Sequence, residues 1–132
     1  MFFLLEFCSG GELFYHIQQK QSFTLDETKV IFAEVVLALE YLHQSNILYR
    51  DLKPENVMVD RDGHVRLADF GLSKLNFASD DFTDSFCGSP EYMSPEMLLT
   101  NSQYSRMVDF YSLGCLLYEL LVGVPPFYSA DR

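Results

Sequence analysis

Apolar side chains recur every three or four residues over residues 25–43, the clearest helical pattern in the chain. This spacing buries one broad face of a helix. Thr24 and Glu27 have the spacing of a capping box, in which each side chain satisfies a free main-chain N–H at the helix start. The pattern therefore predicts a long helix with a defined N-terminus. Its apolar positions are Val30, Ile31, Val35, Ala38, Leu39 and Leu42.

A second long helix is predicted over residues 105–121, because its apolar pattern stops at Gly123 and two prolines follow. A short helix is predicted through Leu13 and Ile17, after a glycine pair. Another is predicted to begin at residues 94–95, which read Ser-Pro, since proline is favoured in the first helical turn.

The rest of the chain predicts little regular structure. Two short apolar runs, 56–59 and 65–68, flank the turn residues 60–63 and predict an antiparallel hairpin. Residues 2–7 are apolar enough for a short buried strand, although no partner strand is evident. Residues 71–90 are polar and without periodicity, which predicts a long mobile loop. The chain is thus expected to be mostly helical with one small hairpin.

The composition favours one globular domain. The chain has 132 residues, of which 48% are hydrophobic, which suffices for one core but not for two domains. Nine basic and 19 acidic residues give a net charge of −10. This charge disfavours nucleic acid and anionic membranes as partners and favours a basic protein or peptide. The alternative is that the acidity only maintains solubility.

The cysteines and the apolar runs favour a soluble, cytoplasmic protein. Cys8, Cys87 and Cys115 are odd in number and far apart, so reduced thiols are expected instead of a disulfide framework or a zinc site. The first apolar run ends at Glu6, too early for a signal peptide. A later apolar run is interrupted by Glu119 and is too short for a membrane span.

Three strings of residues carry candidate chemistry. Residues 49–56 read Tyr-Arg-Asp-Leu-Lys-Pro-Glu-Asn, residues 69–71 read Asp-Phe-Gly, and residues 88–96 read Gly-Ser-Pro-Glu-Tyr-Met-Ser-Pro-Glu. In this order they resemble the catalytic loop, the metal-binding Asp-Phe-Gly and the Ala-Pro-Glu segment of protein kinases. The resemblance implies a protein-kinase-like α+β fold. Residues 1–132 would form a partial domain that runs from the hinge through the catalytic loop and activation segment to the central helix of the C-terminal lobe.

The resemblance implies a role for each polar residue of these strings. Asp51 matches the residue that accepts the proton of the substrate hydroxyl, and Lys53 matches the one that contacts the transferring phosphate. Asn56 and Asp69 match the two side chains that hold Mg²⁺, both oxygen donors of the kind a hard cation prefers. ATP and Mg²⁺ are the cofactors implied. The alternative for four polar residues in turns is ordinary solvation.

Within the family the chain resembles the serine/threonine branch, most closely the group of protein kinases A, G and C. The Lys-Pro-Glu of residues 53–55 and the presence of Ser89 indicate a serine or threonine acceptor. Ser89 matches the hydroxyl that bonds the catalytic Asp and Lys and shapes the acceptor pocket. Tyr49 in place of the commoner His, residues 86–88 and the Gly-x-Pro-Pro-Phe of residues 123–127 are typical of that group.

The resemblance also implies nucleotide contacts outside the catalytic loop. Glu6 to Cys8 match the hinge, whose main chain reads the adenine edge, and Met58 would lie beneath the base. Glu12 matches a residue that reaches the ribose, and the resemblance implies that Glu55 binds the nucleotide as well.

Acidic residues are implied to select the substrate. Glu12, Glu55 and Glu119 match carboxylates that receive substrate arginines. The resemblance therefore implies protein substrates with basic residues near the acceptor, attracted by complementary charge. The alternative is that Glu12 and Glu119 simply occupy exposed helix positions.

Ser85 falls where this group carries its activating phosphorylation, which implies an upstream activating kinase as a partner. A phosphate there would pair with Arg50 and Lys74. The alternative is a solvated loop serine beside Asp84. Asp109 resembles the buried aspartate that anchors the main chain of the catalytic loop. The three histidines lie in no ligand-like cluster and are expected at the surface or in packing.

Several parts of a kinase have no match in these residues: the glycine-rich phosphate loop, the strand lysine with its partner glutamate, and the closing helices. The isolated chain is therefore expected to be a poor catalyst. The first hypothesis is a fragment of an active kinase that transfers the ATP γ-phosphate to serine or threonine. The second is a truncated, non-catalytic kinase-like interaction module. Intact Asp51, Lys53, Asn56 and Asp69 favour the first, because a binding module has no need of them.

Overall fold

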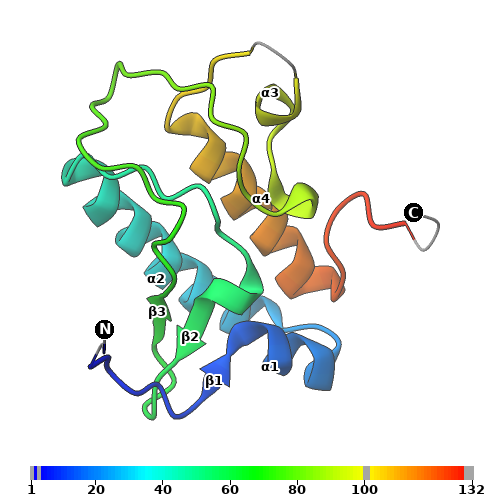
Figure 1. Cartoon of the computed structure of the whole chain (residues 1–132). Coiled ribbons are helices and arrows are strands. Elements are labelled where there is room, and N and C mark those ends of the chain that lie inside the picture. Colours follow the sequence, from blue (N-terminus) through cyan, green and yellow to red (C-terminus); the bar gives the residue numbers. More distant parts are fainter. Residues whose placement is uncertain (1, 3, 100–101, 130–132) are drawn as a thin grey trace.

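A computed structural model describes residues 2, 4–99 and 102–129 of the chain (Figure 1). Its regular structure is mainly helical, with one small antiparallel sheet, which confirms the predicted fold class. The elements, in chain order, are β1 (Gly11–Glu12), α1 (Leu13–Lys20), α2 (Leu25–Gln44), the 3-10 turn η1 (Pro54–Asn56), β2 (Val57–Val59), β3 (Val65–Leu67), the 3-10 turn η2 (Pro90–Tyr92), α3 (Pro95–Leu98) and α4 (Met107–Val122).

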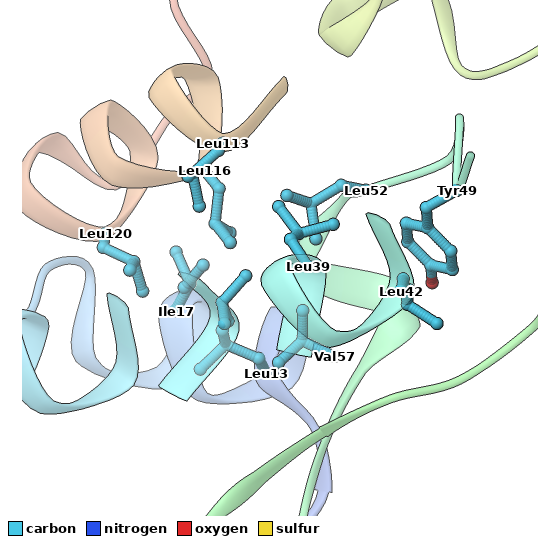
Figure 2. Close-up of a cluster of buried hydrophobic side chains, with 11 residues drawn as sticks. Leu13, Ile17, Leu39, Leu42, Tyr49, Leu52, Val57, Leu113, Leu116 and Leu120 are labelled. Carbon is cyan, nitrogen blue, oxygen red and sulfur yellow. The ribbon is translucent and has the colours of Figure 1, made fainter. Parts of the chain in front are cut away.

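The core lies where α1, α2 and α4 meet residues 49–57. Helix α2 packs against both α4 and strand β3, and Figure 2 shows leucines from all three helices pointing into one cluster. Burying such side chains contributes about 1.5–3 kcal/mol each, so this cluster is the main stabilising feature beneath the candidate site. Its fully buried members are Leu13, Ile17, Val35, Leu39, Leu42, Tyr49, Leu52, Val57, Leu113, Leu116 and Leu120.

Both long helices were predicted within two residues of their ends. Helix α2 begins with the expected capping box: the Glu27 N–H donates to Thr24 Oγ1 at 3.4 Å, and the Thr24 N–H donates to Glu27 Oε2 at 3.0 Å. Helix α4 begins two residues later than predicted. It ends at Val122, and the next residue, Gly123, has a φ of +90°, a left-handed conformation that glycine adopts without strain.

The predicted hairpin is part of a three-stranded sheet in the order β1-β2-β3. Its turn is held by Asp60, whose Oδ1 accepts the main-chain N–H groups of Asp62 and His64 at 3.0 Å each. Strand β1 was not predicted, because two residues carry no readable alternation. It pairs with β2 in the register Gly11 to Val59, and thereby places the segment before it at the edge of the sheet.

Two expectations from sequence need correction or refinement. Residues 2–7 were expected to form a buried strand, but Leu4, Leu5 and Phe7 are at least 80% exposed and belong to no strand; residue 3 lies outside the described residues. Apolar character alone does not make a strand without a partner to pair with. Residues 71–90 are irregular as expected, up to the start of η2 at Pro90. Two isolated β-bridges pair this segment with the rest of the chain, one from Lys74 to Leu48 and one from Thr83 to Tyr104.

Within the described part of the chain, no helix combines the length and apolar character that a membrane crossing requires.

Candidate active site

The loop that follows α2 is fixed by one buried carboxylate on α4. Asp109 is fully buried, and it accepts the N–H of Tyr49 at Oδ2 (3.0 Å) and the N–H of Arg50 at Oδ1 (2.8 Å). The Nε2 atom of His43 lies 2.8 Å from the same Oδ2. Hydrogen bonds to a buried charge are among the stronger ones. The anchoring role expected of Asp109 is confirmed, and His43 is a packing residue, as predicted.

The other two histidines also have structural partners. His16 contacts the main-chain oxygen of Gly10, and His64 contacts Glu34 across the gap between β3 and α2. Among the described residues, no group of three or more His, Cys, Asp or Glu side chains is arranged to hold a metal ion. A zinc-type site is therefore not formed in the described part of the chain, whereas Mg²⁺ needs only one or two carboxylates plus phosphate oxygens.

Four polar side chains converge immediately after the anchor. The Asp51 carboxylate is 7% exposed; its Oδ1 accepts the Ser89 hydroxyl at 3.1 Å and its Oδ2 lies 3.2 Å from the Lys53 ammonium. Lys53 also donates to Ser89 Oγ at 2.8 Å, and the side-chain amide of Asn56 donates to Asp51 Oδ2 at 2.8 Å. The structure thus brings Asp51, Lys53, Asn56 and Ser89 together, although Ser89 comes from a segment more than 30 residues away.

Asn56 joins this network to the end of the hairpin. The Asn56 amide nitrogen donates twice to Asp51, once to its main-chain oxygen and once to its carboxylate. The amide oxygen of Asn56 therefore stays available for another ligand. Its main-chain oxygen accepts the N–H of Ala68 at 2.9 Å. Asp69 follows directly, with a left-handed φ of +53°, and its Oδ1 accepts the N–H of Gly71 at 3.0 Å. One amide oxygen and one exposed carboxylate are a donor set that fits Mg²⁺.

Tyr49 lies near both Asp51 and Asp69. Its buried hydroxyl donates to the main-chain oxygen of Ala68, and its ring meets the ring of Phe70 edge-on at 5.4 Å between centroids. Burial raises the pKa of the Tyr49 phenol most, and the charges of Asp51, Asp69 and Asp109 raise it further. The phenol therefore stays protonated at neutral pH, and both Asp51 and Asp69 lie close enough to act on the same oxygen.

A hollow of about 440 Å³ opens beside Asp69. The segment before β1 forms one wall and the hairpin forms the floor, and an ion pair of 3.5 Å between Glu6 and Arg66 connects the two. The structure therefore brings Glu6, Cys8, Met58 and Asp69 around one mostly apolar space, as the resemblance implied. The lining residues are Leu5, Glu6, Phe7, Cys8, Met58, Arg66, Leu67, Ala68, Asp69 and Phe70.

A second hollow, of about 500 Å³, is lined by Ser89 and bordered by Glu55, Glu91 and Glu119. Glu119 is only 3% exposed and accepts the Tyr92 hydroxyl, so the exposed helix position considered as an alternative is wrong. Burial raises the pKa of Glu119, the Tyr92 hydroxyl opposes this, and the charge of Glu55 adds to it. Glu12 is exposed on β1 and does not border this hollow.

The surroundings of Ser85 bring the two predicted cations near it. Lys74 donates to Thr83 Oγ1 at 2.9 Å, and Thr83 Oγ1 lies 3.3 Å from Ser85 Oγ. On the other side, Arg50 donates to the Tyr104 hydroxyl at 3.2 Å, and that hydroxyl donates to the main-chain oxygen of Ser85. Each cation is one hydroxyl group away from Ser85.

Three residues near these sites were not predicted. Tyr104 and Thr83 carry no motif, and Tyr104 stands in the polar stretch Asn-Ser-Gln-Tyr-Ser-Arg of residues 101–106, where nothing in the sequence marks it as buried. Glu91 precedes Tyr92 within the recognised 88–96 string, so its acidic character in that string was the available signal. Thr83 and Tyr104 are placed by the bridge that pairs them and by the contact of Tyr104 with Arg50, 54 positions earlier.

Comparison with known proteins agrees with this geometry. A model of the protein kinase domain family matches residues 1–132. The serine/threonine-protein kinase YPK1 of Saccharomyces cerevisiae is 51% identical over 131 residues, covering 99% of this chain and 19% of its own length. The serine/threonine-protein kinase gad8 of Schizosaccharomyces pombe is 51% identical over 131 residues, covering 99% of this chain and 23% of its own.

A third relative, the RAC family serine/threonine-protein kinase homolog of Dictyostelium discoideum, is 50% identical over 132 residues, covering 99% of this chain and 30% of its own length. The chain thus spans between 19% and 30% of the length of these three relatives.

Proposed function

The chain belongs to the protein kinase domain family, and from this premise we propose that it supplies the proton-accepting, metal-holding and substrate-facing residues of a serine/threonine protein kinase. Its similarity to serine/threonine kinases of the A, G and C group extends over 99% of its residues. Kinases of this family use ATP and Mg²⁺. The reaction proposed for the whole protein is transfer of the ATP γ-phosphoryl group to a serine or threonine hydroxyl.

The observation that carries the proposal is the closed set of contacts around Asp51. Phosphoryl transfer needs positioned charges more than covalent chemistry. Ser89 and Asn56 hold the two oxygens of the Asp51 carboxylate in fixed directions, at 3.1 and 2.8 Å. A carboxylate held in this way accepts the proton of an incoming substrate hydroxyl without first reorganising.

Lys53 would act on the phosphate instead of the proton. Its ammonium lies 3.2 Å from Asp51, and the Lys53 side chain is 22% exposed, so it is not closed off from an incoming phosphate. Positive charge at this position offsets the negative charge on the transferring group and its oxygens. Ser89, which accepts from Lys53 and donates to Asp51, would keep the two at a constant separation.

Asn56 and Asp69 would hold Mg²⁺ through the amide oxygen and the exposed carboxylate. When bound, the metal neutralises charge on the phosphate oxygens. The contribution of the chain is to fix the two ligands relative to Asp51, which it does through the Asn56 amide and the Asn56–Ala68 main-chain bond. The hollow lined by Glu6, Cys8 and Met58 is the proposed nucleotide site.

The acidic hollow beyond Ser89 supports a preference for basic substrates. Glu55 Oε2 is buried and has no hydrogen-bond partner among the described residues, and Glu119 lies close enough for the charge of Glu55 to act on it. A buried carboxylate (Glu119) and a half-buried one (Glu55) in one hollow are stabilised by a cation. We propose that a substrate arginine supplies it. Glu12, which lies elsewhere, would serve a separate contact.

The proposal has three further parts. The protein would act in the cytoplasm, Ser85 would be phosphorylated, and an upstream activating kinase would add that phosphate. Their support is the group resemblance, the reduced cysteines, and the position of Ser85 between Arg50 and Lys74. The absence of a phosphate loop among these residues supports a poor rate for the chain by itself.

The proposal is tested by phosphotransfer from radiolabelled ATP to arginine-containing serine peptides, using the full-length gene product. Replacing Asp51 by Asn is expected to lower kcat by about 10²–10⁴-fold, the usual contribution of a positioned general base. Asp62→Asn is the matched control, since its side chain is 65% exposed and lies in the hairpin turn. A D51N rate within a few-fold of an active parent would overturn the role proposed for Asp51, whereas no phosphotransfer by the full-length parent would favour the non-catalytic interaction module.

A further inference from the structure

The buried hydroxyl group of Tyr104 is explained neither by the proposed catalytic contacts nor by apolar packing. It is 2% exposed and packs in a cluster distinct from the main core. The apolar part of the ring accounts for that packing, and phenylalanine would pack in the same way. The hydroxyl is different, because a buried polar group is costly unless its hydrogen bonds are made. The other members of this cluster are Leu48, Phe77, Met93, Met97 and Val108.

The Tyr104 hydroxyl has three polar partners, and all of them belong to the proposed regulatory site or to the residues beside it: Arg50, Ser85 and the Cys87 thiol, whose Sγ lies 3.9 Å from the hydroxyl oxygen. It accepts from Arg50 Nη1 at 3.2 Å and donates to the main-chain oxygen of Ser85. Its main chain is paired with Thr83 in both directions, at 3.0 and 2.8 Å. Tyr104 therefore holds the segment around Ser85 from one side and the guanidinium of Arg50 from the other.

Arg50 keeps donors free for a further ligand. Its Nε donates to the Leu72 main-chain oxygen at 2.7 Å, and Nη1 donates to Tyr104. A guanidinium has five N–H donors, so three have no partner among the described residues. Its main chain is fixed as well, through the N–H held by Asp109. The result is a preorganised cation next to the proton-accepting residue, Asp51.

We infer that Tyr104 is a positioning residue for the Ser85 site: its phenol fixes Arg50 and the main chain of Ser85 together, so that a phosphoryl group on Ser85 meets Arg50 and Lys74 at once. The inference rests on the proposed function, in which Ser85 is the regulatory site. An activating kinase would move the γ-phosphoryl group of ATP to Ser85 Oγ, forming the new O–P bond and releasing ADP and the hydroxyl proton. The phosphate adds a charge of about −1.5 to −2.

Lys74 completes the site from the opposite side. Its ammonium already reaches Thr83 Oγ1, which lies 3.3 Å from Ser85 Oγ. Asp84 is the adjoining negative charge in the sequence and opposes the phosphate. Two cations against one neighbouring carboxylate favour the dianion. Since Arg50 directly precedes Asp51, holding its guanidinium would also hold the catalytic loop, and Tyr104 would set how strongly phosphorylation acts on it.

The test is a ³¹P NMR titration of the full chain carrying phosphoserine at position 85. In the parent chain the second phosphate pKa is expected about one pH unit below that of the same chain unfolded in urea, because Arg50 and Lys74 favour the dianion. In Tyr104→Phe this lowering is expected to fall by at least half. Tyr118→Phe, whose side chain is 45% exposed on α4, is the control and should match the parent.

A purely structural role for Tyr104 predicts a different result. The Y104F variant would then have a lower unfolding midpoint by the same amount with and without the phosphate, and an unchanged phosphate pKa. That outcome overturns the inference. If Y104F does not fold, ¹³Cζ-labelled tyrosine in the parent chain replaces it: phosphorylation of Ser85 must shift the Tyr104 resonance, and an unmoved resonance overturns the inference too.

This experiment separates the inference from the proposed function. No phosphotransfer is measured, so a catalytically silent Asp51→Asn chain should give the same titration as the parent. If the full-length protein is an active kinase but Y104F leaves the phosphate pKa unchanged, only the inference about Tyr104 fails. If the protein is inactive but Y104F still reduces the lowering of the phosphate pKa, only the proposed function fails.

Discussion

The side-chain amide of Asn56 lies 2.8 Å from both the main-chain oxygen and the carboxylate Oδ2 of Asp51. One amide group thus fixes the direction of the carboxylate proposed to accept the proton, and it leaves its own oxygen to the proposed metal ion. The arrangement would link the two proposed functions, proton acceptance and metal binding, within a six-residue turn. The turn itself is rigid because the buried Asp109 holds its first main-chain N–H groups.

Asp109 is expected to be essential for stability. Asp109→Ala would leave the buried N–H groups of Tyr49 and Arg50 and the His43 ring without their acceptor, at a cost of roughly 3–5 kcal/mol in the free energy of unfolding. Urea denaturation of the chain measures it. Asp26→Ala is the control, because Asp26 is 93% exposed and its ion pair with Lys29 is expected to contribute below about 0.5 kcal/mol. Equal losses in the two variants would contradict the anchoring role.

Replacing Gly114, within α4, and Gly123, directly after it, by alanine is expected to change the free energy of unfolding in opposite directions. A Cβ at Gly123, where φ is +90°, would lie 1.8 Å from the main-chain oxygen of Gln21, so Gly123→Ala is expected to destabilise by more than about 2 kcal/mol. A Cβ at Gly114, inside the helix, meets nothing within 4 Å. Gly114→Ala should stabilise by about 0.5–1 kcal/mol, because alanine is the better helix former. Thermal unfolding of both variants tests the signs, and a destabilised G114A would refute the packing described for α4.

The contact between His64 and Glu34 predicts a pH dependence of stability. Its hydrogen bond to Glu34 raises the pKa of His64 above the ordinary 6.5. Burial alone would raise the pKa of Glu34, but the Val65 N–H and the His64 ring hold it below the ordinary 4.5. The His64 contribution is therefore full below pH 6.5 and lost as pH rises through its folded pKa. The Glu34 contribution is present above pH 4.5 and lost as pH falls through its folded pKa.

The pair should accordingly stabilise the chain most between pH 4.5 and 6.5. The measurement is the urea midpoint of the parent and of His64→Gln from pH 4 to pH 8. The difference between the two is expected to be largest inside that window and to shrink on both sides. A difference that stays constant over the whole range would show that the pair does not titrate as described.

The isolated chain is expected to show negligible phosphotransfer with Mg-ATP. The residues that cradle the phosphates and the lysine–glutamate pair have no counterpart in it, and the family mechanism needs both. A coupled ADP-release assay on the 132-residue chain measures this. A turnover of about 1–100 per second, the range of an intact kinase, would contradict it.

The sequence was sufficient wherever structure depends on near neighbours. The capping box of Thr24 and Glu27 and the apolar period of α2 are local signals, and the structure has both. The motif strings similarly located Asp51, Lys53, Asn56 and Asp69 in turns and at the end of a strand. Resemblance, and not periodicity, supplied the roles of these residues.

What could not be predicted depends on contacts between distant segments. The two residues of β1 become a strand only because β2 lies beside them. Tyr104 lies 54 positions from Arg50, and no pattern in the sequence joins its hydroxyl to that guanidinium. Glu119 has the pattern of a helix residue, yet it is buried because Tyr92 from another segment covers it. In each case packing decided the outcome.

The central claim is that the turn of Asp51 and the hairpin end at Asp69 serve one metal–nucleotide site. Paramagnetic broadening by Mn²⁺ with ATP, read in ¹⁵N NMR spectra of the chain, tests it most directly. The side-chain amide of Asn56 and the main-chain N–H of Gly71 should broaden together at the same low Mn²⁺ concentration, while the N–H groups of Gly63 and Gly114 stay sharp. Broadening of either Asn56 or Gly71 without the other would contradict the claim.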